Sequence, residues 1–361
     1  MEFAPFPEDY RAGFAVLVGR PNAGKSTLTN ALVGQKVAIT SNRPQTTRHT
    51  IRGIVHRDDY QLVLVDTPGL HRPRTLLGER LNDMVAQTLS EVDVIGFCIP
   101  ADEKIGPGDR YIAQQLAASG HKPIVAIVTK ADKVSREDLG LQLLAVQELG
   151  EQVMSAERAA RQARKERQER KKKGQQDLPF RKDSGPAARR AQGAQDQETV
   201  KDGLGGWADI IPVSAVSDYQ VEEVAQLLAS RLPDSPPLYP TGELTDEPEA
   251  TLVAELVREA ALEGVKDELP HSVAVTVEEM ELREGRSENN PLLDIHVNLF
   301  VERDSQKGII IGKGGSRLRE IGAQARRNIE ALLGTKVFLS IHVKVAKDWQ
   351  RDPRALGKLG F

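Results

Sequence analysis

The sequence predicts an α/β domain with a mostly parallel sheet flanked by helices, followed by a smaller α+β domain. Three observations lead to this prediction. Apolar runs typical of buried strands alternate with helical segments over the first two thirds of the chain. A proline-dense segment at residues 233–240 then interrupts that pattern. Beyond it, strands with alternating apolar residues are interspersed with amphipathic helices.

Composition indicates a soluble globular protein with at least two domains. The chain has 361 residues, which is longer than one ordinary domain. Of these residues 39% are hydrophobic, and the formal net charge is −3. The single cysteine, Cys98, lies in an apolar run and is expected to be a buried core thiol, which suits a reducing cytosol. The acidic, proline-bearing N-terminus is unlike a signal peptide, and no apolar run is long enough to span a bilayer.

A phosphate-binding loop follows the first predicted strand. Residues 13–18 form an apolar strand, residues 27–32 a helix that ends near Gly34, and the loop between them matches G-x-x-x-x-G-K-S at residues 19–26. Glycines let the backbone wrap closely around phosphate oxygens, and N–H groups at the helix N-terminus supply donors. This context predicts a nucleoside triphosphate site of the P-loop NTPase fold. Its expected contacts are Asn22, Ala23, Gly24, Lys25, Ser26 and Thr27.

Catalysis and metal binding are assigned to a few side chains around this loop. Lys25 is expected to reach the β- and γ-phosphates, and the Ser26 hydroxyl to ligate Mg²⁺. Residues 37–48 are polar and contain proline, so they are expected to form an exposed loop, in which Thr47, or Thr46 as the alternative, senses Mg²⁺ and the γ-phosphate. The strand at residues 61–65 delivers Asp66, which can hold Mg²⁺ through water, and Gly69, whose N–H can reach the γ-phosphate.

Two later strands supply a base-binding site. The strands at residues 92–99 and 124–128 are apolar, and the second leads to Thr129, Lys130 and Asp132. Asp132 can accept two hydrogen bonds from the N1–H and amine of guanine, for which adenine has no equivalent, and Lys130 can lay its stem along the base. The strand at residues 210–213 leads to Ser214 and Ala215, whose backbone is expected to touch the guanine oxygen. The alternatives are an ordinary charged turn and a helix cap.

A charged insertion separates these base-binding segments. The apolar spacing of residues 139–154 predicts a helix, but residues from about 155 to 206 are rich in charged residues, glutamine and glycine. Such a segment is expected to be disordered or a solvated single helix. It is either a basic arm that rests on RNA phosphates or a tolerated surface insertion, and the second interpretation is favoured.

The second domain has the element order of a type II KH domain. A helix at 251–265 and strands at 272–282 and 292–301 precede a helix, a G-x-x-G loop, a helix at 316–333 and a strand at 337–345. Because the proline-dense segment precedes this domain, we divide the chain into residues 1–232, a linker at 233–245, and residues 246–361.

KH domains clamp about four single-stranded nucleotides between the G-x-x-G loop and an apolar groove. The expected RNA contacts are Gly312, Lys313, Gly314 and Gly315 in the loop, Ile309 and Ile311 in the groove, and Arg317, Arg319, Arg326 and Arg327 at phosphates.

The ordered segments resemble the guanine-nucleotide motifs of translation-factor-type small GTPases. The strings at residues 66–73, 77–79 and 301–307 narrow the resemblance to the Era family of ribosome-assembly GTPases. This resemblance implies GTP hydrolysis, with GTP or GDP and Mg²⁺ bound. Asn22 matches the asparagine that helps coordinate K⁺ in related GTPases, so a bound K⁺ is one implication. The alternative is an asparagine that only stabilises its own turn. The implied partners are the single-stranded 3′ end of small-subunit (16S) rRNA and the small (30S) ribosomal subunit. A cytoplasmic monomer is implied, and peripheral association with the inner face of the cell membrane is left open.

Two residues depart from related GTPases and keep other functions in consideration. Thr129 replaces an asparagine of the family motif and can make fewer hydrogen bonds, so weaker nucleotide affinity is expected. Leu70 lies where Ras-like enzymes place a water-orienting glutamine, so slow intrinsic turnover is expected. One alternative is an RNA-binding scaffold whose nucleotide site scarcely turns over. Another is a GTPase that assists RNA modification.

Overall fold

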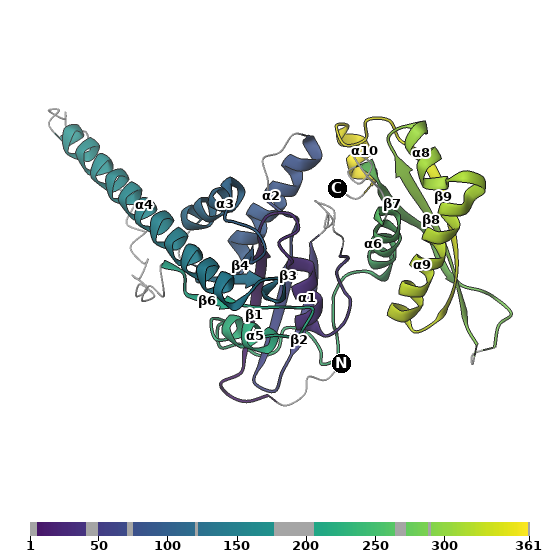
Figure 1. Ribbon diagram of the computed structural model, residues 1–361, viewed down its shortest axis with the longest axis horizontal. Coiled ribbons are helices and arrows are strands. Elements are labelled where there is room, and N and C mark those ends of the chain that lie inside the picture. Colours follow the sequence, from purple (N-terminus) through teal and green to yellow (C-terminus); the bar gives the residue numbers. More distant parts are fainter. Residues whose placement is uncertain are drawn as a thin grey trace, which may run out of the picture.

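The computed structural model describes residues 6–40, 50–70, 75–119, 122–176, 206–263, 272–287 and 290–359. They form two sheets, each with its own helices and apolar core, that lie side by side along the long axis of the molecule (Figure 1). This confirms the predicted fold class, an α/β P-loop domain followed by an α+β KH domain.

The first sheet has six strands in the order β2-β3-β1-β4-β5-β6. Strand β2 is antiparallel to β3, and the other neighbouring pairs are parallel. Carboxyl ends of parallel strands meet at one edge, so the loops after β1, β3, β5 and β6 gather there. The strands are β1 (Arg11–Val18), β2 (Ile51–His56), β3 (Tyr60–Asp66), β4 (Val94–Pro100), β5 (Ile124–Thr129) and β6 (Asp209–Pro212). All except β2 were predicted.

Helices cover both faces of this sheet. Apolar side chains of α1 (Lys25–Val33) and α5 (Val221–Ala229) share one buried core with the strands. Those of α2 (Leu76–Glu91), α3 (Pro107–Ala118) and α4 (Arg136–Gln176) share the core on the other face. The predicted helix at 27–32 corresponds to α1. Burial raises the pKa of the Cys98 thiol to about 12, so this cysteine is the expected inert core residue.

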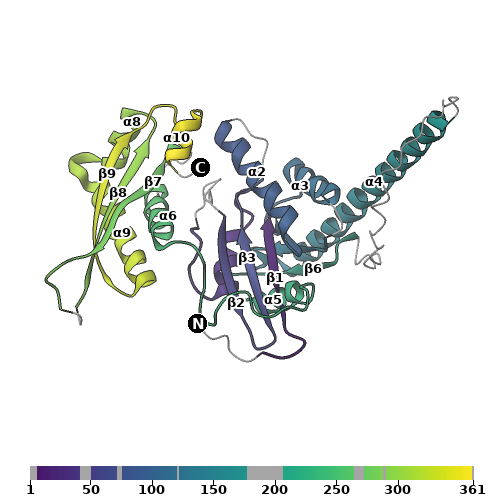
Figure 2. The ribbon, with the colours of Figure 1, turned by 180° about the vertical axis from the view of Figure 1, so that it is seen from behind.

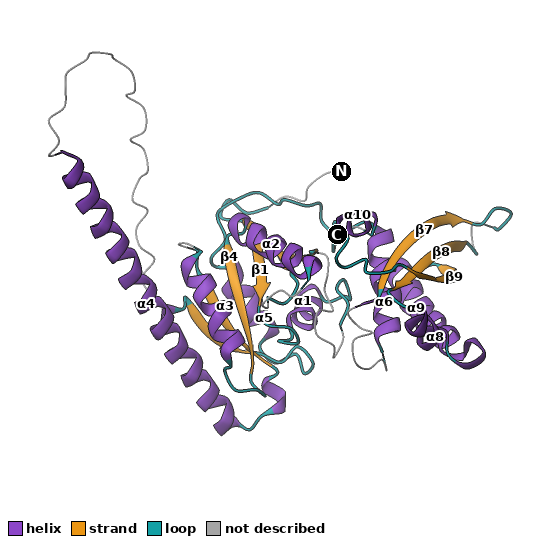
Figure 3. Ribbon diagram, turned by 90° about the horizontal axis from the view of Figure 1, so that it is seen from above, coloured by secondary structure: helices purple, strands orange, loops and turns teal. Residues whose placement is uncertain are grey.

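Helix α4 is longer than its apolar spacing predicts. It continues through the first part of the charged insertion to Gln176, and Figures 1 and 3 show it running past α3 and away from the sheet. Arg161 contacts the domain near the point where α4 leaves it: its guanidinium pairs with Glu157 at 3.0 Å and donates to the carbonyl oxygen of Ala117 at 3.1 Å. The helical alternative therefore holds for residues 155–176, whereas residues 177–205 lie outside the described residues.

The second sheet has the order β7-β8-β9, with β7 antiparallel and β9 parallel to β8. Its apolar face packs on α6 and α9, and α6 lies between the two sheets (Figures 1 and 2). The element order is the one predicted for a type II KH domain. The elements are α6 (Glu249–Leu262), β7 (Ala274–Leu282), β8 (Leu292–Val301), α8 (Asp304–Ile311), α9 (Ser316–Leu333), β9 (Lys336–Val345) and α10 (Pro353–Lys358).

Within the residues that the structure describes, the two domains contact each other at two places. At the first, Leu77 and Leu81 of α2 form an apolar cluster with Trp349 and with Leu356 and Leu359 near the C-terminal end of the chain. The backbone N–H of Leu77 also donates to the carbonyl oxygen of Gln350 at 3.2 Å. Helix α2 follows the loop that contains Asp66 and Gly69, so one nucleotide-site loop leads directly into this contact.

The second contact corrects a prediction. Residues 37–48 were expected to form an exposed loop, but Val37, Ala38 and Ile39 are buried. The side-chain oxygen of Asn30 accepts hydrogen bonds from the backbone N–H groups of Val37 and Ala38, at 2.9 and 2.8 Å. Ile39 packs in the apolar core of the second domain. The prediction was wrong here because the partners of these residues are distant in the sequence.

The proline-rich segment lies along the first sheet. Gln61 of β3 accepts hydrogen bonds from the backbone N–H groups of Leu238 and Tyr239, at 2.7 and 2.9 Å. The N–H of Ile54 donates to the carbonyl oxygen of Leu244 at 2.9 Å. These bonds fix the path of the chain toward α6. Among the helices of the described part of the chain, none is both long and apolar enough to cross a membrane.

Candidate nucleotide site and RNA-binding loop

The phosphate loop buries its lysine. The Lys25 ammonium donates to the carbonyl oxygens of Gly19 and Arg20, both at 3.2 Å, and the residue is 6% exposed. Burial lowers the pKa of Lys25, and the negative charge of Asp66 partly opposes that shift. A buried cation at the N-terminus of α1 favours an anionic ligand, because phosphate oxygens can replace the solvation that the ammonium has lost.

Two predicted magnesium ligands lie in contact beside this lysine. The Ser26 hydroxyl, in the first turn of α1, donates to Oδ2 of Asp66 at 2.7 Å, and Asp66 is fully buried at the end of β3. A hydroxyl and a carboxylate suit a hard cation such as Mg²⁺. The described residues contain no group of three or more His, Cys, Asp and Glu side chains that could hold a metal. The Ser26 hydroxyl and the Asp66 carboxylate fit an ion that takes its remaining ligands from phosphates and water.

Gly69 lies tightly against the phosphate loop. A Cβ atom at this position would lie 2.6 Å from the backbone nitrogen of Pro21, so a side chain cannot fit without moving the loop. The Thr67 hydroxyl donates to the carbonyl oxygen of Leu17 at 3.1 Å, which holds the turn after β3 against β1. Residues Thr46 and Thr47, proposed from the sequence as metal ligands, lie outside the described residues.

The predicted base-binding segments meet at the same edge. The Thr129 hydroxyl donates to the carbonyl oxygen of Ala23 at 2.7 Å, a buried bond between β5 and the phosphate loop. The N–H of Ala131 donates to the carbonyl oxygen of Val213 at 3.1 Å, which holds this segment beside Ser214. Ser214 is buried, whereas the Asp132 side chain is exposed, as it must be to meet a ligand. Ala215 and Asn22 lie in the adjoining loops, and Gly24 and Thr27 flank Lys25 and Ser26.

A charge cluster that sequence reasoning missed connects the phosphate loop with the base-binding segment. Arg20 pairs with Glu103 at 2.7 Å and with the buried Asp109 at 3.1 Å. The Lys130 ammonium lies 3.3 Å from Asp102 and 3.6 Å from Glu103. The available signal was an acidic pair just after the buried strand β4, at the edge where the other site residues gather. The cluster fixes Arg20 and Lys130 relative to each other.

The G-x-x-G loop connects α8 to α9 with a backbone that favours glycine. Gly312, Gly314 and Gly315 have φ angles of 71°, 59° and 75°, in the left-handed region that side chains disfavour. Lys313 and Gly314 are exposed at its tip. In the preceding α8, Ile309 is 53% exposed, Ile310 is buried in the core, and Ile311 is half-buried. The loop is therefore open to a ligand, with Ile309 beside it.

The four arginines expected at RNA phosphates differ in their surroundings. Arg326 and Arg327 are exposed on α9, and Arg319 donates to the carbonyl oxygen of Gly314 at 3.3 Å. Arg317 instead reaches the C-terminal end of α6, where its guanidinium donates to the carbonyl oxygens of Ala261 and Glu263. In this structure Arg317 thus links the start of α9, next to the loop, to the C-terminal end of α6.

Comparison with known proteins identifies the family. Residues 14–130 match the family described as 50S ribosome-binding GTPase, and residues 268–350 match the KH domain family. The chain is 58% identical over 352 residues to GTPase Era of Streptomyces coelicolor, covering 98% of this chain and 95% of that protein. It is 56% identical over 354 residues to GTPase Era of Mycolicibacterium smegmatis, covering 98% and 99%. The chain belongs to the Era family of GTPases.

Solved Era structures match nearly the whole chain. One is Era in complex with MgGDPNP and nucleotides 1506–1542 of 16S ribosomal RNA, with 31% identity and a TM-score of 0.78, covering 97% of this chain and 99% of that one. The other is a variant of Aquifex aeolicus Era bound to GDP and AlF4⁻, with 30% identity, a TM-score of 0.77 and the same coverage. Both domains of this Era GTPase, in this order, are therefore shared with its relatives.

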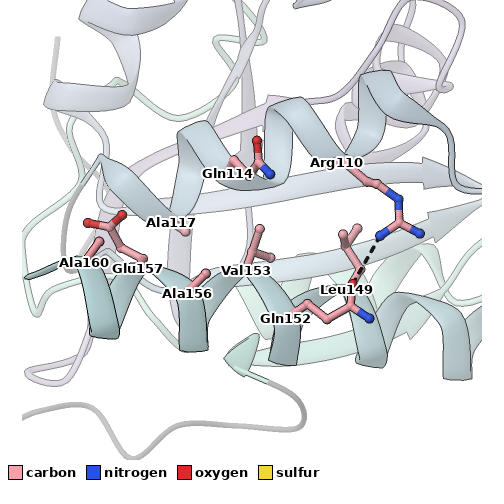
Figure 4. Close-up of a pocket in the computed structure, with 9 residues that line it drawn as sticks. All are labelled: Arg110, Gln114, Ala117, Leu149, Gln152, Val153, Ala156, Glu157 and Ala160. Atoms are coloured by element: carbon pink, nitrogen blue, oxygen red, sulfur yellow. Dashed lines mark hydrogen bonds between the residues drawn. The ribbon is translucent and has the colours of Figure 1, made fainter.

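A pocket of about 320 Å³ lies away from the predicted Era site residues. It is formed between α3 and α4, and Arg110 of α3 donates to Gln152 of α4 at 3.2 Å beside it (Figure 4). Much of its lining is small or apolar, including Ala117, Ala156 and Ala160 (Figure 4). None of the predicted nucleotide or RNA contacts lines it. We interpret it as a packing groove between the two helices.

Replacing Thr129 by valine tests the hydrogen bond between the Thr129 hydroxyl and the phosphate loop. Valine keeps the shape but leaves the buried carbonyl oxygen of Ala23 without its donor, and such a loss costs about 1–3 kcal/mol. We expect the affinity of the Era site for GDP to fall about 10-fold. The measurement is titration with a fluorescent GDP analogue. Thr129→Ser, which keeps the hydroxyl, should bind nearly as the wild type. Equal affinities of the valine and serine variants would contradict this role.

Proposed function

We propose that this Era GTPase uses Mg²⁺-dependent GTP hydrolysis to control how its KH domain holds the single-stranded 3′ end of small-subunit ribosomal RNA. The task would be maturation of the small ribosomal subunit. The observation that carries the proposal is the match over both domains to an Era solved with a magnesium-bound GTP analogue and a 16S rRNA fragment. The contact of Ser26 with Asp66 and the open loop at Gly312–Gly315 are consistent with the two ligands.

In the proposed reaction, water attacks the γ-phosphorus of GTP and the bond to the β–γ bridging oxygen breaks, giving GDP and phosphate. Lys25 neutralises developing charge on the phosphates, and Ser26 and Asp66 are the residues that would hold Mg²⁺, which would offset the same charge. Thr47 and the N–H of Gly69 contact the γ-phosphate and so distinguish GTP from GDP. Leu70 packs beside the core cluster of the first sheet and cannot orient water, so intrinsic turnover should be slow.

A monovalent cation is the second part of the proposal. Asn22 adopts a left-handed backbone conformation, with φ at 64°, in the phosphate loop. We propose that its side chain helps hold K⁺ beside the phosphates, where the ion supplies positive charge that an arginine finger supplies elsewhere. Replacing K⁺ by Na⁺ at constant ionic strength should then lower the hydrolysis rate. Equal rates in the two salts would remove K⁺ from the mechanism.

The deciding experiment measures steady-state GTP hydrolysis in potassium buffer. The protein is assayed alone, with a short RNA that copies the 3′ end of small-subunit rRNA, and with a scrambled RNA of the same composition. Stimulation by the matching RNA alone is the expected result. Equal binding of both RNAs with no change in rate would reduce the function to a GTPase attached to a general RNA clamp. Binding of GTP with no multiple turnover under any condition would favour the scaffold alternative.

A further inference from the structure

A buried carboxylate on α6 ties the second domain to a segment of the first. Glu259 is only 5% exposed at its side chain. One oxygen accepts from the Lys36 ammonium at 2.5 Å, and the other accepts from the backbone N–H and hydroxyl of Thr40, at 2.8 and 3.3 Å. A buried charge that satisfies three donors is costly to disrupt, because each donor would lose a charge-assisted hydrogen bond.

Apolar packing reinforces the same contact. Ile39 lies in the sequence between Lys36 and Thr40 and is 2% exposed within the core of the second domain. The segment from Lys36 to Thr40 is thus attached to α6 by both polar and apolar contacts. It cannot shift by itself without exposing Ile39 or leaving Glu259 unpaired. A displacement of Thr40 is therefore expected to move α6 as well.

The next turn of α6 is attached to the G-x-x-G loop. Arg317, in the first turn of α9, donates to the carbonyl oxygens of Ala261 and Glu263. It also limits the loop itself, since a Cβ atom at Gly312 would lie 2.8 Å from the Cβ of Arg317. Residues 259–263 span little more than one helical turn, about 6 Å. The contacts of Glu259 and Arg317 therefore lie about one turn apart, at the C-terminal end of α6 and its capping residue Glu263.

We propose that Glu259 and Arg317 are positioning residues that transmit the position of Thr40 to the G-x-x-G loop through the last turn of α6. The inference rests on the proposed function, in which the chain just beyond Thr40 contains the γ-phosphate sensor Thr47. When the sensor engages the triphosphate, the strain on Thr40 is passed to Glu259, and the α6 carbonyls bias the position of Arg317 and hence of Gly312. RNA affinity then depends on which nucleotide is bound.

The test measures RNA affinity of the full-length protein with GDPNP and with GDP. The probe is a fluorescent single-stranded RNA that copies the 3′ end of small-subunit rRNA, followed by polarisation. The variants are Glu259→Gln, Arg317→Met and the double variant, with Lys36→Met added because Lys36 is partly exposed and its loss is less disruptive to folding. The matched control is Glu249→Gln, the same chemical change at an exposed position of the same helix. GDP affinity and melting temperature are measured for each variant.

In the wild type the two affinities should differ about fivefold or more, the usual scale of coupling between sites. Glu259→Gln and Arg317→Met should each reduce this difference to within about twofold, and Lys36→Met should reduce it in part. The double variant should behave like either single variant, because the effects of residues that act in series are not additive. Glu249→Gln should behave as the wild type, and GDP affinity should be unchanged throughout.

Three results would overturn the proposal. The first is an intact nucleotide dependence in both Glu259→Gln and Lys36→Met. The second is an Arg317→Met variant that loses RNA affinity equally with both nucleotides, with a lower salt dependence, since that is the behaviour of a direct phosphate contact. The third is a wild type whose RNA affinity ignores the nucleotide. That result also overturns the proposed control of RNA binding by GTP, whereas the first two results overturn only the transmission through Glu259 and Arg317 and leave the proposed function in place.

Discussion

Replacing Asp132 by asparagine should change the base preference of the nucleotide site from guanine to xanthine. The exposed Asp132 carboxylate is expected to accept hydrogen bonds from the N1–H and the 2-amino group of guanine. Asparagine presents one acceptor and one donor, and its donor opposes the 2-amino group. Xanthine carries an oxygen at that position and can accept from the asparagine amide. A site that loses a designed hydrogen-bond pair discriminates by orders of magnitude.

We expect the affinity of Asp132→Asn for GTP to fall at least about 100-fold, while xanthosine triphosphate becomes the better ligand and substrate. Competition against a fluorescent GDP analogue measures affinity, and phosphate release measures turnover with each triphosphate. Asp58→Asn makes the same chemical change at an exposed turn between β2 and β3 and should leave both unchanged. An Asp132→Asn variant that still prefers GTP would show that another group reads the base.

The elements that hold the nucleotide site were predictable because their signals are local. A buried parallel strand is an unbroken apolar run, and a phosphate loop is defined by glycines at fixed spacing. Asp66, Thr129 and Ser214 each directly follow such a run, and parallel pairing brings the ends of the runs to one edge of the sheet. Sequence reasoning could therefore place the residues together, although it could not give the contact of Ser26 with Asp66.

Contacts between distant segments could not be predicted in the same way. Ile39 stands in a short apolar triplet that looks like part of a loop, and its burial depends on a helix more than 200 residues further along the chain. Arg317 was expected at an RNA phosphate because an arginine beside G-x-x-G usually suggests one. Its hydrogen bonds to α6 depend on how α6 and α9 pack. Periodicity describes which face of an element is apolar, and not which element covers it.

The limited hydrogen-bonding capacity of Thr129 can be read from the sequence, but whether its hydroxyl reaches the phosphate loop depends on a distance that only the structure gives. A threonine has fewer hydrogen-bonding groups than the asparagine it replaces. The phosphate loop nevertheless passes so close to β5 that the short hydroxyl reaches Ala23 at 2.7 Å. A Cβ atom at Gly24 would lie only 3.5 Å from the Thr129 side chain. A buried hydrogen bond between the phosphate loop and the end of β5 is therefore made by this smaller residue.

Substituting aspartate for both Lys313 and Gly314 should remove RNA binding and leave the fold intact. The two residues are exposed at the tip of the G-x-x-G loop, and a Cβ atom at Gly314 would meet nothing within 4 Å. Its φ of 59° is a left-handed conformation that aspartate tolerates better than most residues, at a cost of about 1 kcal/mol. The two carboxylates would lie where phosphates must approach. We expect RNA affinity to fall at least about 10-fold in 100 mM salt, and the salt dependence to weaken by about 0.7 in log–log slope for each lost phosphate contact.

The opposite end of α9 provides a matched control. Gly334 also has a left-handed φ, 65°, with nothing within 4 Å of an added Cβ, and Lys336 is exposed two residues later. Replacing this pair by aspartates makes the same change in charge and the same backbone demand at the other end of one helix. RNA polarisation titrations and melting temperatures compare the two variants. If the loop assignment is right, only the change at Lys313 and Gly314 weakens RNA binding, while both variants melt alike and hydrolyse GTP at the same basal rate. Equal losses from both would mean that the domain attracts RNA through its net charge, and the G-x-x-G loop would no longer be the assigned contact.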